Sequence, residues 1–162
     1  MHTYIRISIL IVIVIFLSIL LTSCSVLTPK PHNVEFYDEF SIRPKADYIY
    51  IVTDSFGVEV DETDIMIPRN FETDLASVPR WYWSFIAPIS TELVAPAILH
   101  DYLYSCPAYF TREEIDDIFY WGLIANGVSE YTSYQMYIVI RIFGGRHFHE
   151  AAVECTVPAT FD

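Results

Sequence analysis

A predominantly apolar run near the start of the chain, Ile7 to Leu21, limits which residues remain to build a folded domain. Arg6 precedes the run, and "LTSC" follows it, ending at Cys24. A basic start, a short apolar stretch and small residues directly before a cysteine are typical of a lipoprotein signal. We therefore expect a cleaved signal over residues 1–23 and lipidation of Cys24 with acyl chains such as palmitate.

The signal predicts a location outside the cytoplasm, because the cationic residue beside the apolar run precedes it. Ser25 stands where an Asp is typical of lipoproteins retained at the inner membrane. An anchor in the outer membrane, facing the periplasm, is therefore favoured. An uncleaved anchor is the alternative, although the run is short for a spanning helix, which needs roughly 20 residues.

Removal of the first 23 of 162 residues leaves 139, enough for one domain. We expect a Pro-containing tether over residues 24–32 and a single domain over 33–162. The net charge of −12 becomes −13 when Arg6 is removed, which excludes nucleic acid as a partner because binding it relies on basic clusters. Cys106 and Cys155 remain, and a disulfide between them is compatible with an oxidising compartment.

The pattern along the chain predicts an α+β domain: a small N-terminal antiparallel sheet followed by a three-helix C-terminal half. Short β-rich runs occupy residues 33–70, and "TDSFG", Thr53 to Gly57, is predicted to turn a hairpin. The expected helices are Leu93 to Tyr104, a helix opened by a Thr111–Glu114 capping box and closed at Asn126-Gly127, and Ser129 to Phe143. The last is apolar on every side, so it is expected to be the central buried element.

The sequence "AILHDYLY" places His100 and Tyr104 on one face of the first helix, with Asp101 about a quarter-turn away. If the first two helices pack antiparallel, His100 meets Asp116 across the interface. A carboxylate there would fix the imidazole tautomer and support a general base, and would leave Asp101 for a cation. The alternative is a core histidine bonded to one carboxylate, which locks two helices together.

The stretch "NFETDLASVPRWYW", Asn70 to Trp83, is predicted to be a structured loop, in which Asp74 and Ser77 bond nearby amides. Two further sites rank lower. Ser77, His100 and Asp116 could form a nucleophile triad, although no nucleophile-elbow glycines flank the serine. The sequence "HFHE", His147 to Glu150, could bind a transition metal, although a solvated tail is more common.

Four motifs in this order, "NFETDLASVPRWYW", "AILHDYLY", "REEIDDIF" and "RIFGG", resemble those of a family of unknown function, the domain numbered thirteen-fifty-three, found in phage and bacterial genomes. The resemblance runs from about Phe36 to Arg146 and implies no activity. The usual pattern of that family has Gly where this chain has Asn70. Asn is the next residue most tolerant of positive φ, so the turn is expected to survive.

The His helix and its partner are also similar to the two-helix core of secreted calcium-dependent phospholipases of the A-two type. This resemblance implies His100 as base, Asp101 as calcium ligand, Asp116 as the group that orients the His and Tyr104 as its support. The Gly-rich calcium loop and the cysteines that staple the helix pair in those enzymes are missing here. The Asp74 loop could supply the oxygens instead.

The sequence therefore predicts an exported, envelope-associated lipoprotein, phage-derived in type, whose domain binds a partner without catalysis. The alternative is a cation-dependent hydrolase of lipid or another ester at the membrane, with calcium as the candidate cofactor. Membrane attachment through Cys24 is expected, and the protein partner is unknown. The candidate residues are His100, Tyr104 and Asp116 for catalysis and Asp74 and Asp101 for a metal.

Overall fold

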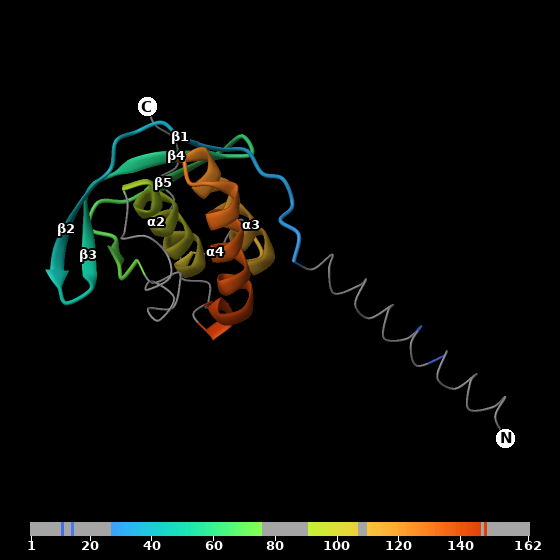
Figure 1. Ribbon diagram of the computed structural model, residues 1–162. Helices are drawn as coiled ribbons and strands as arrows, with labels where there is room; N and C mark the ends of the chain where they lie inside the picture. Colours follow the sequence, from blue (N-terminus) through green and yellow to red (C-terminus); the bar gives the residue numbers. More distant parts are fainter. Residues whose placement is uncertain are drawn as a thin grey trace, which may run out of the picture.

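The computed structural model describes residues 11, 14, 27–75, 91–106, 110–146 and 148. Over this part of the chain, two antiparallel sheets of three strands precede three helices, which confirms the predicted α+β class. Figure 1 shows the helices gathered beneath the sheet β1–β4–β5, while the β2–β3 hairpin projects to one side. The strands are β1 (Val34–Phe36), β2 (Ser41–Ala46), β3 (Ile49–Asp54), β4 (Phe56–Val60), β5 (Thr63–Ile67) and β6 (Glu72–Thr73).

The helices are α2 (Thr91–Ser105), α3 (Arg112–Ala125) and α4 (Glu130–Phe143), followed by the 3-10 turn η2 (Gly144–Arg146). The predicted capping box is confirmed, because the Thr111 hydroxyl accepts from the Glu114 N–H while the Glu114 carboxylate accepts from the Thr111 N–H. Gly127 takes a φ of +93° after α3, as its sequence predicts. None of the helices in the described ranges has the length and apolar character needed to span a bilayer.

The predicted hairpin over Thr53 to Gly57 is wrong. β3 pairs with β2 and β6, whereas β4 pairs with β1 and β5, so the chain passes from one sheet to the other at Ser55. A single residue between two strands is too short for a two-residue hairpin turn. A turn of that kind lies at Asp61-Glu62, where both residues have positive φ, 48° and 66°.

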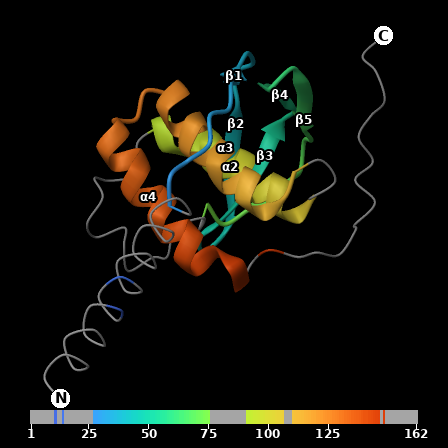
Figure 2. The ribbon, with the colours of Figure 1, turned by 90° about the vertical axis from the view of Figure 1, so that its right-hand side faces the viewer.

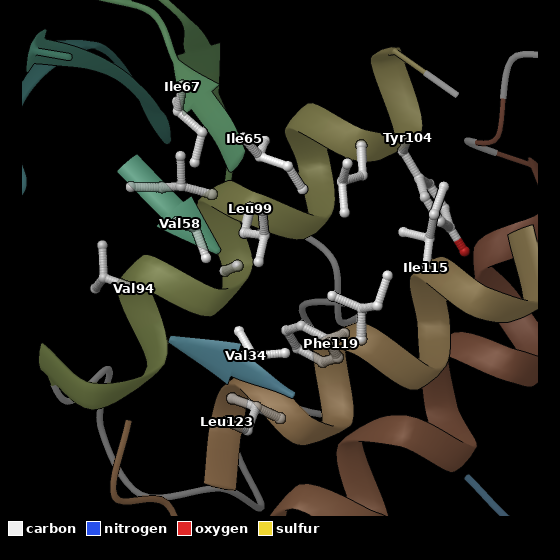
Figure 3. Packing of buried hydrophobic residues seen from close by; sticks show 14 of the residues in the cluster. Val34, Val58, Ile65, Ile67, Val94, Leu99, Tyr104, Ile115, Phe119 and Leu123 are labelled. Atoms are coloured by element: carbon white, nitrogen blue, oxygen red, sulfur yellow. The ribbon is translucent and has the colours of Figure 1, made fainter. Parts of the chain in front are cut away.

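The hydrophobic core lies between the sheet β1–β4–β5 and the inner faces of α2 and α3. Phe56, Val58 and Val60 alternate along β4 and have no exposed surface, which is the pattern of a strand with one buried face. Figure 3 shows side chains from β4 and β5 pointing toward those of α2 and α3, among them Leu99 and Phe119. This packing fixes the position of α2 relative to α3.

The expectation that residues 129–143 form the central buried element is wrong. α3 packs against both α2 and α4 and also touches β1, so α3 is the central helix. α4 covers one side of α3, and its outer face exposes Tyr131 and Ile142, which are 74% and 60% exposed. An apolar sequence on all sides predicts burial only if enough other elements exist to cover every side.

Pro96 lies inside α2 and is buried, a feature that normally breaks a helix because proline has no N–H for the preceding turn. The carbonyl that loses its partner is that of Glu92, four residues earlier. The side-chain amide of Asn126, at the C-cap of α3, donates to this carbonyl at 2.7 Å. Asn126, at the end of α3, therefore donates to the Glu92 carbonyl of α2 that Pro96 leaves without a helical N–H.

We predict that Asn126→Ala lowers the free energy of unfolding by about 1 kcal/mol, because the Glu92 carbonyl then loses its protein donor. In a Pro96→Ala background the same change should cost less, since the introduced alanine supplies the helical N–H. Urea unfolding of the four proteins gives this double-mutant cycle. Additive effects of the two substitutions would contradict the assignment.

Candidate functional site

A buried carboxylate, Asp116 on α3, is the point at which three helices meet. Its Oδ1 accepts hydrogen bonds from His100 Nε2 at 3.2 Å and from the Tyr104 hydroxyl at 2.5 Å. His100 and Tyr104 are one turn apart on α2, and their rings contact at a centroid distance of 4.0 Å. The contact between His100 and Asp116 that the helix spacing predicts is therefore present, and Tyr104 joins it.

Two arginines hold the other oxygen of this carboxylate. Arg141 Nη1, from α4, lies 3.2 Å from Asp116 Oδ2, and Arg112 Nη2, one turn earlier on α3, lies 3.8 Å away. Arg112 Nη2 also donates to the carbonyls of Ile140 and Arg141, at 3.3 and 2.8 Å. Arg112 thereby satisfies carbonyls in the last turn of α4, where a cation is also favoured by the helix dipole.

The Asp116 side chain is fully buried, which by itself raises the pKa of a carboxyl group. The hydrogen bonds from His100 and Tyr104 and the charge of Arg112 outweigh the burial, so the pKa of Asp116 is lowered. Burial and then the Asp116 charge raise the pKa of Tyr104. At neutral pH Asp116 is an anion, and Tyr104 is a protonated donor to it.

The next residue, Asp117, is shifted in the opposite direction. It is 4% exposed, and burial raises its pKa although the Tyr137 hydroxyl and the Lys30 N–H both donate to it. Burial and the Asp117 contact raise the pKa of Tyr137. Adjacent acids on α3 therefore differ because charged donors surround Asp116, whereas neutral donors bind Asp117.

The carboxylate has no proton to give, so His100 must carry its hydrogen on Nε2. The second ring nitrogen, Nδ1, is buried and has no hydrogen-bond partner among the described residues. This is the tautomer that a general base would need. However, His100 is 2% exposed and is not among the described residues that line the neighbouring pocket.

That pocket has a volume of about 340 Å³ and lies between β6, the residues after it and the C-terminal half of α2. Asp74 and Asp101 both line it, so the structure brings these two predicted ligands to one cavity. The Thr73 hydroxyl donates to Asp101 and accepts from the Leu75 N–H at 3.0 Å, which attaches the loop to α2. Asn70, which precedes the loop, has the expected positive φ of 71°.

The two carboxylates do not form part of a larger group of metal ligands among the described residues. In the described ranges, no group of three or more His, Cys, Asp or Glu side chains is placed to hold a metal ion. The lipidation candidate Cys24, the serine of the triad alternative, Ser77, and the motif His147 to Glu150 lie outside the described residues. Cys106 is disulfide-bonded, and its expected partner Cys155 is also outside them.

The sequence reasoning missed Arg141, although a signal was present. A single cation inside the apolar stretch "MYIVIRIF" must either reach solvent or find a buried anion. Its guanidinium side chain is 11% exposed and lies beside Asp116. The Asp117–Tyr137 contact was also missed, because the sides of α3 and α4 that face each other depend on how the two helices pack.

Residues 50–140, more than half of the chain, match the family described as "Protein of unknown function (DUF1353)". The chain is also similar to "Uncharacterized protein y4jT" of Sinorhizobium fredii (strain NBRC 101917 / NGR234), with 26% identity over 120 residues. That match covers 68% of this chain and 35% of the relative, so the chain corresponds to about a third of that protein. No solved structure matches significantly.

We predict opposite outcomes for the two neighbouring carboxylates. Asp116→Asn should lower the free energy of unfolding at pH 7 by about 3–5 kcal/mol, because the partly buried guanidinium groups of Arg141 and Arg112 lose their anion. Asp117→Asn should have little effect or stabilise, because its charge is disfavoured by burial and the amide still accepts from Tyr137. Urea unfolding of the two isosteric variants makes this comparison.

The pH dependence follows from the directions of the shifts. The lowered pKa of Asp116 contributes stability that is present above the unfolded value, about 3.9, and is lost as the pH falls through the folded value. The raised pKa of Asp117 contributes stability below about 3.9 that is lost as the pH rises. The cost of Asp116→Asn should therefore shrink below about pH 4. An undiminished cost there would contradict the assignment.

Proposed function

This chain belongs to the DUF1353 family, and we propose that it is an exported lipoprotein whose domain binds a cationic group of a partner in the pocket beside α2, without catalysis. The pocket carries the proposal. It combines acidic side chains, Glu72, Asp74 and Asp101, with the aromatic rings of Phe71 and Tyr104. Carboxylates and aromatic faces both attract ammonium and guanidinium groups.

The buried cluster supports a structural role for the histidine. Both oxygens of Asp116 are occupied by donors from its own fold, and the arginines neutralise its charge. The His100 ring contacts the rings of Tyr104 and Phe119 in tilted arrangements, with centroid distances of 4.0 and 4.9 Å. Side chains held on all sides in this way keep α2 in place, and with it the pocket wall formed by Asp101 and Tyr104.

The pocket wall is stabilised independently on its other side. Thr73 is 4% exposed, and its hydroxyl donates to Asp101, which links β6 to α2. At the rim of the pocket, Glu72 pairs with Lys45. The hydrogen bond from Thr73 holds the Asp101 carboxylate on the wall of the pocket, and a carboxylate in that position attracts a cation. The strongly acidic composition of the chain, with 21 acidic against 9 basic residues, favours approach of such a partner.

Attachment to the membrane is part of the proposal and is supported by the sequence pattern that ends at Cys24. A lipid anchor would restrict the search of the domain to partners in the envelope, which raises their effective concentration. The likeness to a family found in phage and bacterial genomes supports a phage-related origin.

We predict that N-acetyl-arginine amide or N-acetyl-lysine amide binds the full-length chain, while N-acetyl-glutamine amide does not. Asp101→Asn, which keeps an oxygen for Thr73, should weaken binding about tenfold, the effect of losing one charge-assisted hydrogen bond. Glu39→Gln, an exposed change in the loop after β1, is the control and should have no effect. Isothermal titration calorimetry measures both, and equal affinity for cationic and neutral amides would refute the proposal.

A cation-dependent hydrolase is the second candidate, favoured by one observation. His100 donates from Nε2 to an aspartate and leaves Nδ1 without a described partner, while Asp101 follows it in the sequence and lines a pocket. Such a base would take a proton from water through Nδ1. Its burial and the lack of a described ligand cluster place this candidate second.

We expect calcium to leave the melting temperature of the full-length chain unchanged, and phosphatidylcholine vesicles to release no fatty acid. A ligand at 100 times its Kd would stabilise a folded protein that binds it by about 2.7 kcal/mol, so a catalytic ion would be visible. Differential scanning calorimetry of the parent and of Asp101→Asn tests this. A calcium-dependent rise that the substitution removes, together with lipolysis, would establish the hydrolase instead.

A further inference from the structure

The outer face of α4 is apolar where a surface helix is normally polar. Tyr131, Tyr134, Ile138 and Ile142 recur at three- and four-residue intervals, so they form one stripe along the helix, here called the α4 stripe. Tyr131 is 74% exposed, Tyr134 42% and Ile142 60%, and Ile138 is partly buried. From Tyr131 to Ile142 the α4 stripe is roughly 16 Å long.

The segment that leads into the domain is bound beside this stripe. The Tyr134 hydroxyl donates to the Leu27 carbonyl at 3.2 Å, and the Trp121 indole N–H donates to the Lys30 carbonyl at 2.6 Å. Lys30 also donates its backbone N–H to Asp117. Figure 2 shows this segment running across α3 and α4. The expected tether is thus attached to the helices from Leu27 onward.

We propose that the α4 stripe lies on the lipid surface in which Cys24 is anchored, an inference that rests on the proposed membrane anchor. Leu27 is the third residue after Cys24, and an extended chain spans at most about 3.6 Å per residue. The docked Leu27 therefore lies within about 11 Å of an acylated Cys24, and the Tyr134 hydroxyl lies 3.2 Å from the Leu27 carbonyl. At that distance the neighbouring face of the domain meets the headgroup layer.

The chemistry of the α4 stripe fits that layer. Tyrosine places an apolar ring and a polar hydroxyl at the boundary of headgroups and acyl chains, while isoleucine enters the apolar side. Because the chain has a net charge of −12, attraction to anionic lipid does not hold it there. Contact comes from burial of the apolar stripe, as in amphipathic helices that lie in the membrane interface.

The test places an extra tryptophan at one of two positions with matched exposure. Ile142→Trp lies on the α4 stripe, and Tyr48→Trp, at a site that is 59% exposed, lies on the β2–β3 hairpin away from residues 27–33 (Figure 1). The full-length chain is incorporated into phosphatidylethanolamine and phosphatidylglycerol vesicles with or without brominated acyl chains, which quench tryptophan in contact with them. We expect at least twofold more quenching of the added signal at position 142 than at position 48.

Equal quenching at the two positions would overturn the inference, whether or not the chain is acylated. Incorporation of labelled palmitate measures the anchor separately, with Cys24→Ser as its control. If the chain is acylated but shows no excess quenching at position 142, the anchor is supported and membrane contact of the α4 stripe is refuted. If the chain is not acylated but shows excess quenching, membrane contact of the α4 stripe is supported and the anchor is refuted. If the protein is a dimer in detergent and shows no excess quenching, a second copy of the chain covers the α4 stripe. That result also overturns the inference.

Discussion

The arrangement of the three helices depends on the hydrogen bonds and ion pairs of the buried Asp116 carboxylate. α3 provides the anion, α2 provides His100 and Tyr104, and α4 provides Arg141. A fully buried charge is tolerated only when donors surround it, so each helix must bring its donor to within hydrogen-bond distance. Apolar packing alone would tolerate small slides between helices, whereas this set of directional contacts fixes their relative register. Rotation of α2 would remove the donors to Oδ1 of Asp116, and rotation of α4 would remove Arg141 from Oδ2.

The same cluster determines where chemistry could occur nearby. His100 and Tyr104 point from α2 to Asp116, and the residues that follow each of them, Asp101 and Ser105, lie about 100° further around the helix and line the pocket. The buried cluster and the pocket therefore lie on adjacent faces of one helix, and Tyr104 contributes to both. Neighbouring residues of one helix can therefore differ in environment: His100 is buried against Asp116, and Asp101 lies on the pocket wall.

Helical periodicity was sufficient to predict the pair His100 and Asp116, because a short connection between two helices makes antiparallel packing the simplest arrangement. The capping box at Thr111 was readable for a similar reason, since it depends on contacts three residues apart. Contacts that depend on tertiary arrangement were not readable. The passage between sheets at Ser55 looks like a turn in sequence, and the inward direction of Arg141 depends on which side of α4 meets α3.

α4 was expected to be buried on every side, and its exposed apolar face indicates what surrounds the helix. The helix turns its cation inward, where Arg141 meets Asp116, and turns an apolar stripe outward, which is the reverse of an ordinary surface helix. Reversal of this kind costs solubility unless the outer face is covered. The docked segment from Leu27 to Lys30 leads directly from this face toward the proposed lipid anchor. A bilayer would cover the stripe, whereas the residues that line the pocket belong to other elements, among them β6 and α2.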